Sequence, residues 1–194
     1  MSWTEIAAAV LTLANIGLVV RRSVWNFPVG ILAVAIYGTV FFEARLYSDA
    51  LLQVFFVVVQ LYGWWKWRSA IADEGELVVS WSPPRTMALS LVVAIVLMAS
   101  LGTAMHRWTD AASPYLDATV AAGSVVAQFL LSFRRIENWI YWIAVNVLSI
   151  GLYLSRGLNV SAGLYAMLLV LAVAGLLGWL RSSRQSQAAA SAFA

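Results

Sequence analysis

The chain has 194 residues, of which 62% are hydrophobic and 11% are charged, and its formal net charge is +3. Because soluble domains carry about 25% charged residues, this composition excludes an ordinary soluble domain and indicates a protein embedded in a bilayer. The chain contains no cysteine, which excludes disulfides, thiolate metal sites and thiol nucleophiles. Its basic residues stand singly or in pairs at the ends of apolar segments, a pattern that indicates membrane orientation and not nucleic-acid binding.

Seven apolar segments follow one another along the chain, each close to the length of about 20 residues that crosses a hydrocarbon core. They run over residues 4–20, 25–43, 48–66, 86–105, 115–133, 138–155 and 159–180. No basic region precedes the first segment, so we expect a retained helix there and not a signal peptide. Residues 69–85 are expected to form a solvated connector, and residues 182–194 a disordered tail. The sequence therefore predicts an all-α integral membrane protein with seven transmembrane helices.

The basic residues predict the orientation of these helices. With seven spans, three basic residues fall on one side of the membrane, namely Arg45, Arg107 and Arg156. Nine fall on the other side, namely Arg21, Arg22, Lys66, Arg68, Arg85, Arg134, Arg135, Arg181 and Arg184. Since basic residues favour cytoplasmic loops, we expect the N-terminus outside and the C-terminus in the cytoplasm of a multi-pass inner-membrane protein.

The sequence also contains an internal repeat, which appears when the chain is aligned with itself at one constant offset. The alignment pairs Arg22 with Arg134, Asn26 with Asn138, Gly63 with Gly175, and Trp67 with Trp179, and we call positions paired in this way equivalent. It predicts two parallel three-helix repeats, residues 1–68 and 113–181, which are joined by a connector and linker helix over residues 69–112. Transporters of the SWEET type have this 3+1+3 plan, with the substrate held between the repeats near the midplane.

Polar side chains form lines along four of the predicted helices, because residues separated by 3, 4, 7 or 11 positions share a helical face. In chain order the lines contain Asn26 and Tyr37; Asp49, Gln53 and Gln60; Asp117, Ser124 and Gln128; and Trp142, Asn146, Ser149 and Tyr153. Polar groups are costly in lipid, so such lines indicate a pocket or a path. Amides and aromatic rings together suit a ligand with an aromatic ring, an amide and a hydroxylated sugar. The alternative is that these groups join helices by hydrogen bonds.

Two acidic residues near the outer helix ends have two interpretations. Asp49 and Asp117 could contact a substrate or a proton, or could cap a helix N-terminus. The capping interpretation is preferred for Asp49, whereas both stay open for Asp117. No acidic residue lies at mid-membrane, which argues against coupling to protons or sodium.

Most of the ten tryptophans lie at predicted helix ends, where their rings are expected at the membrane surface. These interfacial candidates are Trp25, Trp64, Trp65, Trp67, Trp139 and Trp179. Trp142 differs, because it lies one turn deeper and on the face of Asn146. The single histidine, His106, has no partners for a metal site. No metal or cofactor is expected. The motifs of intramembrane enzymes are missing from the sequence, which leaves a structural or sensor subunit as the alternative to a transporter.

Several segments together resemble the PnuC-type vitamin transporters over about residues 20–180. They are residues 61–67 (Leu-Tyr-Gly-Trp-Trp-Lys-Trp), 114–117 (Pro-Tyr-Leu-Asp), 135–139 (Arg-Ile-Glu-Asn-Trp) and 141–153, which includes Trp142, Asn146 and Tyr153. The resemblance implies a nicotinamide riboside transporter that works by facilitated diffusion, with the substrate trapped by a cytoplasmic kinase. It assigns ring stacking to Trp142, an amide contact to Asn146, and the carboxamide or ribose to Gln53.

The resemblance leaves the substrate open, since related members carry thiamine or other ring-bearing vitamins and nucleosides. Members of the family assemble as trimers, which makes a homotrimer a candidate assembly. The candidate substrate-binding residues are Trp142, Asn146, Gln53, Gln128, Asp117, Tyr153, Tyr37, Gln60 and Ser124.

Overall fold

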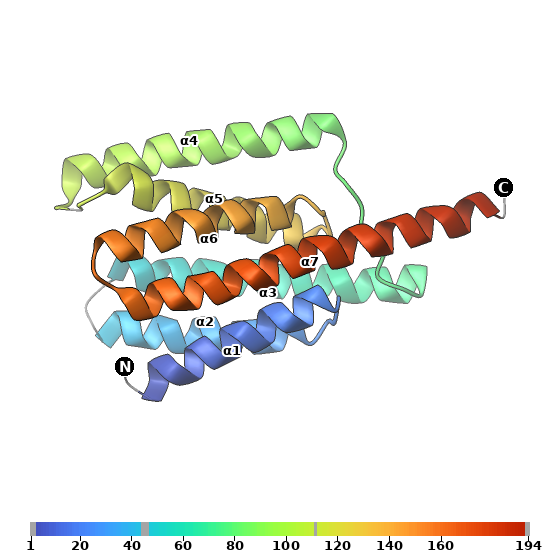
Figure 1. Ribbon diagram of the computed structural model, residues 1–194, viewed down its shortest axis with the longest axis horizontal. Coiled ribbons are helices and arrows are strands. Elements are labelled where there is room, and N and C mark those ends of the chain that lie inside the picture. Colours follow the sequence, from blue (N-terminus) through green and yellow to red (C-terminus); the bar gives the residue numbers. More distant parts are fainter. Residues whose placement is uncertain (1–2, 44–46, 111, 193–194) are drawn as a thin grey trace.

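The computed structural model describes residues 3–43, 47–110 and 112–192, which form seven helices (Figure 1). The helices are α1 (Trp3–Val20), α2 (Asn26–Glu43), α3 (Tyr47–Glu74), α4 (Pro84–Trp108), α5 (Pro114–Ser132), α6 (Asn138–Ser155) and α7 (Asn159–Ala192). Within these residues the only β-type pairing is one isolated bridge between Ser80 and Arg135. The expected all-α class is therefore confirmed.

Five of the seven helices, namely α2 and α4 to α7, are long and apolar enough to cross a membrane. The first helix contains a shorter apolar stretch, Ile6–Val20. The third helix is 28 residues long and contains both amides and charged residues. By length and composition the described chain therefore has the helices of a multi-pass membrane protein.

Two helices continue beyond the predicted spans. The third helix extends to Glu74 instead of ending near residue 66, and the seventh extends to Ala192. The expectation of a disordered tail from residue 182 is wrong for the described residues, where Ser182 and Ser183 are buried. Hydropathy marks where a helix leaves the apolar layer. The continuing residues, 67–74 and 181–192, include six alanines and three arginines, which favour helix, so the backbone hydrogen bonding goes on.

Six helices form a ring. Helix α2 contacts α1 and α3, and α6 contacts α5 and α7. The ring is closed by contacts of α3 with α5 and of α7 with α1. Among the described residues α4 packs only against α5, and Figure 1 shows it along the outer edge. The helices α1, α3, α5 and α7 all finish at one end of the ring (Figure 1). We call it the basic end, because it carries Arg21, Arg22, Lys66, Arg68, Arg134, Arg135 and Arg181.

At the basic end, equivalent positions of the internal repeat make the same local contacts. The first and fifth helices are each followed by an arginine with positive φ, Arg22 at 57° and Arg134 at 61°. In each case the arginine N–H donates to the carbonyl three residues earlier, Val19 or Leu131, at 2.9 Å. The following N–H donates to the carbonyl five residues earlier, also at 2.9 Å. These are the two hydrogen bonds of a Schellman cap, here with arginine in the place usually taken by glycine.

The aromatic core at the basic end has the same internal correspondence. The ring of Phe27 meets Trp67 edge-on, with centroids 5.1 Å apart at 90°. Trp139 meets Trp179 in the same way, at 5.5 Å and 89°. All four side chains are buried. The expectation that Trp67, Trp139 and Trp179 lie at the membrane surface is therefore wrong. Trp25 is exposed, as a surface position requires.

The connector between α3 and α4 is packed onto the basic end, contrary to the solvated loop that the sequence predicts. The guanidinium of Arg22 donates to the Leu77 carbonyl at 3.4 Å. Further along, the Ser80 N–H donates to the Arg134 carbonyl at 3.3 Å, and the Ser80 carbonyl accepts from the Ile136 N–H at 3.0 Å. Buried Leu77 and Val79 explain why this segment leaves water. The connector therefore joins the α1–α2 corner to the α5–α6 corner.

The connector also explains a buried carboxylate. Glu137 is buried directly before α6, and its two carboxylate oxygens accept from the Ser82 N–H at 3.1 and 3.2 Å. The sequence analysis included Glu137 in the segment 135–139 but assigned it no role. In the structure it holds the end of the connector.

Candidate functional site

All nine candidate residues lie on four helices of the ring, α2, α3, α5 and α6, with none on α4. Gln60, Gln128 and Asn146 are buried, and Ser149 on the same line is buried as well. The partly buried members are Tyr37, Gln53, Ser124, Trp142 and Tyr153. The remaining candidate, Asp117, lies in the first turn of α5. The side chain of Asp49 lies outside the described part of the chain.

Near the start of α2, the small size of Gly30 makes room for two amides. A Cβ at Gly30 would clash with the side-chain oxygen of Gln60 and would lie 2.5 Å from the side-chain nitrogen of Asn15. The Asn15 amide is fixed by donating to the Asn26 carbonyl at 2.5 Å. Three helices, α1, α2 and α3, thus bring Asn15, Gly30 and Gln60 together.

Asn15 was missed by the sequence analysis, although it is one of only two polar residues in the middle of the first apolar segment. The other is Thr12, one turn away, whose hydroxyl donates to the Ala8 carbonyl at 2.8 Å. A pair of polar residues spaced by three positions was the available signal.

The equivalent positions in the second repeat have the opposite character. Gly30 corresponds to Trp142, while Asn15 and Gln60 correspond to Ala127 and Ala172, both of which are buried. Trp142 is partly buried and packs against the aromatic core. At these three positions α1–α3 carry two amides and a glycine, whereas α5–α7 carry one indole and two alanines, although Gln128 and Asn146 add amides on α5 and α6. The candidate residues of the ring thus combine amides from both helix sets with one indole from α6.

Four amide side chains lack hydrogen-bond partners among the described residues, namely Gln53, Gln60, Gln128 and Asn146. The hydroxyl of Ser149 is also buried without a partner in that part of the chain. Leaving a buried polar group unsatisfied costs about 1–3 kcal/mol. The buried Ser149 hydroxyl, on the same line as Asn146, therefore favours a site that a polar ligand or water completes.

Further toward the opposite end lies a second layer of candidates. The Gln53 Cβ is 3.4 Å from the position of a Cβ at Gly38. The rings of Tyr153 and Tyr165 lie 5.1 Å apart. Tyr165 was not a candidate, although its position is equivalent to that of Gln53. Seven residues of helix separate Gln53 from Gln60, which is about 10 Å along the axis. This length suits a ring joined to a sugar.

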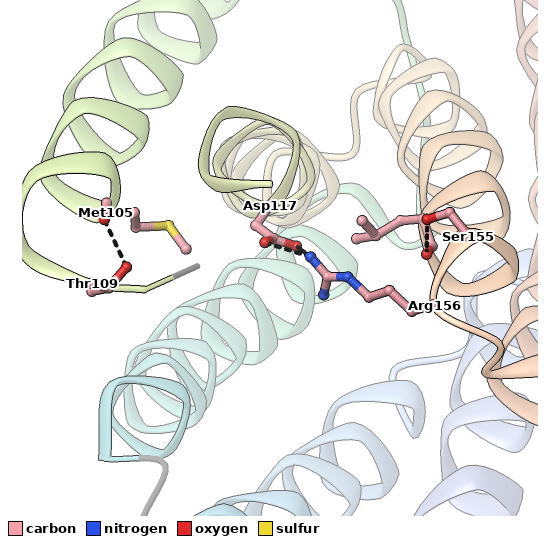
Figure 2. Close-up of polar contacts among 6 residues, drawn as sticks. Met105, Thr109, Asp117, Ser155 and Arg156 are labelled. Carbon is pink, nitrogen blue, oxygen red and sulfur yellow. Dashed lines mark hydrogen bonds and ion pairs between the residues drawn. The ribbon is translucent and has the colours of Figure 1, made fainter. Parts of the chain in front are cut away.

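Two candidates have partners that limit their role. One guanidinium nitrogen of Arg156 contacts both carboxylate oxygens of Asp117, at 2.8 and 3.1 Å (Figure 2). The pair joins the start of α5 to the end of α6, with side-chain exposures of 34% for Arg156 and 21% for Asp117. The Ser124 hydroxyl donates to the Val120 carbonyl of its own helix at 2.8 Å. Its oxygen can still accept a second bond.

Two surface hollows lie away from these residues. One, of about 400 Å³, follows the outer face of α4 and is lined by Ala99, Ser100, Thr103, Ala104, Arg107 and Trp108. The other, of about 200 Å³, is lined by Val78, Ser80, Phe133, Arg134 and Arg135 at the basic end. Neither hollow contains a candidate substrate-binding residue.

Comparison with known proteins gives a consistent family. Residues 2–181 match the family model described as nicotinamide mononucleotide transporter. The nicotinamide riboside transporter PnuC of Escherichia coli (strain K12) is 29% identical over 210 residues, which cover 95% of this chain and 88% of that protein. The riboflavin/roseoflavin transporter RibM of Streptomyces davaonensis is 28% identical over 192 residues, with the same two coverages, 95% and 88%.

The fold is also similar to that of a solved structure. The crystal structure of the vitamin B3 transporter PnuC superposes with a TM-score of 0.77 at 26% identity. The superposition covers 95% of this chain and 83% of that one.

Proposed function

Because this chain belongs to the nicotinamide mononucleotide transporter family, which is also the family of the PnuC transporters, we propose that it carries nicotinamide riboside across the bacterial inner membrane by facilitated diffusion. Phosphorylation by a cytoplasmic kinase would then trap the substrate. The observation that carries the proposal is the similarity to a nicotinamide riboside transporter along 95% of the chain. The unpaired amides inside the ring support it from the structure.

The chemistry of nicotinamide riboside matches the indole and the amides of the site. Its pyridinium ring is flat and cationic, so the indole of Trp142 can stack on it with an added cation–π attraction. Its carboxamide offers a donor and an acceptor, which Asn146 and Gln128 complement. Its ribose hydroxyls suit Gln53 and Gln60.

The remaining candidates surround this core in the proposal. Tyr37 and Tyr153 form the outer wall, and Ser124 accepts one further hydrogen bond. Asp117 attracts the cationic ring at the outer mouth by exchanging its bond with Arg156 for the substrate. In this proposal the basic end faces the cytoplasm and the N-terminus lies outside.

The mechanism that we propose uses two three-helix repeats, residues 1–68 and 113–181, which rock around the site and are linked by residues 69–112. The matching arginine caps and tryptophan pairs at equivalent positions support this division. The ring gives it a geometry, because the sets α1–α3 and α5–α7 contact each other only through α3 with α5 and α7 with α1 among the described residues. The assembly in the bilayer is a homotrimer.

A second substrate is favoured by one observation. The riboflavin/roseoflavin transporter RibM matches this chain at nearly the same identity and the same coverage as the Escherichia coli protein. Riboflavin or another ring-bearing vitamin such as thiamine is therefore the alternative substrate for the same fold.

Uptake by the purified protein in liposomes tests the proposal. Labelled nicotinamide riboside should equilibrate across the bilayer without an ion gradient, and unlabelled riboside should compete. Liposomes without protein provide the background. Competition by riboflavin or thiamine but not by the riboside would overturn the substrate, and accumulation that requires a gradient would overturn facilitated diffusion.

A further inference from the structure

We propose that Trp67 and Trp179 form the cytoplasmic gate of the transport path and that the structure shows this gate closed. The inference rests on the proposed function, since a gate requires a path between the two sets of helices. It goes beyond the binding site by assigning the groups that block the exit.

Two hydrogen bonds cross reciprocally between the helix sets. The indole N–H of Trp67 on α3 donates to the Leu131 carbonyl of α5 at 3.1 Å. The indole N–H of Trp179 on α7 donates to the Val19 carbonyl of α1 at 3.2 Å. The two donors occupy equivalent positions, as do the two acceptors, so the second bond repeats the first in the opposite direction. Both bonds must break when the two sets separate at this end.

The two indoles also contact each other and close the space between the sets. Their ring centroids are 6.1 Å apart, and both side chains have no exposed surface. The rings of Phe27 and Trp139 support them edge-on from either side. This packing depends on two glycines, because a Cβ at Gly63 would lie 2.6 Å from the Phe27 ring. At Gly175 a Cβ would clash with the Trp139 ring.

The tryptophan pair lies on the line of the proposed path. Gln53, Gln60 and Trp67 follow at intervals of seven residues, so they share one face of α3. Tyr165, Ala172 and Trp179 follow at the same interval on α7. Trp67 is therefore about 10 Å closer to the basic end than Gln60. A substrate leaving the amides toward the cytoplasm meets the two indoles next.

The bonding of the acceptor carbonyls allows these contacts to open and close. Val19 and Leu131 each also accept the N–H of the arginine three residues later, at 2.9 Å. A carbonyl has two lone pairs, so each acceptor keeps one partner when the indole leaves. The released indole N–H groups can be solvated by water that enters the open path. The bonds can therefore break without leaving a buried group unsatisfied.

Thiol labelling tests the gate without a substrate, because the chain has no cysteine and one introduced cysteine is unique. Ser132→Cys places the probe at a buried position beside Gly63, where the Ser132 hydroxyl would lie 2.8 Å from a Cβ on that glycine. Inside-out vesicles are treated with a membrane-impermeant maleimide, and the labelling rate is measured. Trp67→Phe and Trp179→Phe each remove one indole donor while keeping an aromatic ring. Each should raise the rate by about fivefold, the change expected from one buried hydrogen bond.

Two controls separate a gate from a structural core. Trp65→Phe changes an exposed tryptophan on the same helix and should leave the rate unchanged. A second probe, Ala8→Cys, is buried in α1 far from the basic end and should stay unlabelled in every variant. An unchanged rate at Ser132→Cys in either tryptophan variant, or a rise at both probes, would overturn the gate. Failure of riboside uptake by the unmodified protein would overturn the proposed function and leave the labelling result standing.

Discussion

The side-chain oxygen of Gln60 lies so close to Gly30 that a Cβ there would clash with it, and the Asn15 amide lies beside it. The position of these two amides thus depends on the lack of a Cβ at residue 30. Gly30→Ala should displace both amides from the middle of the ring, since overpacking a filled interior costs about 1–3 kcal/mol. We expect riboside uptake to fall by about tenfold, which corresponds to about 1.4 kcal/mol. The measurement is uptake into liposomes at several substrate concentrations.

Gly38→Ala is the matched control for this variant. It lies on the same helix, but a Cβ there would be in ordinary contact with the Gln53 Cβ at 3.4 Å. Uptake by Gly38→Ala should stay within about twofold of the unmodified protein, because no atom has to move. Equal losses in the two variants would show that α2 tolerates no added volume and that Gln60 is not specifically required.

Trp142→Ala should weaken substrate binding by about tenfold or more, because stacking of an aromatic side chain on a base contributes about 1–3 kcal/mol. Binding to the detergent-solubilised protein can be measured by calorimetry. Trp65→Ala is the appropriate comparison, since Trp65 is exposed and outside the site. Trp179→Ala is not, because Trp179 is buried in the aromatic core and its loss would reduce stability. Similar affinities for Trp142→Ala and Trp65→Ala would remove Trp142 from the site.

Asp117→Asn should reduce riboside uptake several-fold, whereas Arg156→Gln should not, because only the carboxylate attracts a cationic ring. The two changes remove the same partly exposed ion pair, which by itself contributes less than about 1 kcal/mol to stability. Comparing the two variants in one uptake assay therefore isolates the charge of Asp117. If both reduce uptake equally, the pair only joins α5 to α6.

Arg22→Gly should be more stable than Arg22→Ala by about 1 kcal/mol, because Arg22 has a positive φ that only glycine adopts without strain. Both variants lose the guanidinium bonds to the Leu77 carbonyl and the Ser182 hydroxyl. Their difference therefore reports the backbone strain alone. Thermal unfolding in detergent measures it, and the same pair of changes at Arg21, which lies outside the positive-φ position, should favour alanine over glycine.

The sequence predicted the spans best where hydrophobicity and helix end at the same residue. The sixth helix has the expected bounds, 138–155, since Asn138 starts it and Arg156 follows its last residue. The third and seventh helices run further than expected, because hydropathy does not report where backbone hydrogen bonding stops. The prediction of a solvated connector was wrong for a different reason. Its anchors, Glu137 and Arg22, are distant in sequence.

Predicting that these tryptophans are buried requires information that a single sequence lacks. Position along the helix assigns Trp25, Trp67 and Trp179 equally to the membrane surface. Only the closure of the ring, through α3 with α5 and α7 with α1, decides that Trp67 and Trp179 face inward. The inward-facing amides were easier to predict, because polar groups have few favourable places in lipid. Asn15 was missed because its hydrogen-bond partner, the Asn26 carbonyl, belongs to the backbone and leaves no pattern in the sequence.

The packed connector limits how far the two three-helix sets can separate at the basic end. Leu77 is held by the α1–α2 corner through Arg22, and Ser80 is held by the α5–α6 corner through Arg134 and Ile136. Three peptide units separate Leu77 from Ser80, and even fully extended they reach only about 11 Å. The segment from Leu77 to Ser80 is therefore a tether that limits the distance between the two corners. While the hydrogen bonds at Leu77 and Ser80 both hold, the two corners can separate only until this segment is fully extended. Wide opening toward the basic end therefore begins when one of these sets of hydrogen bonds breaks.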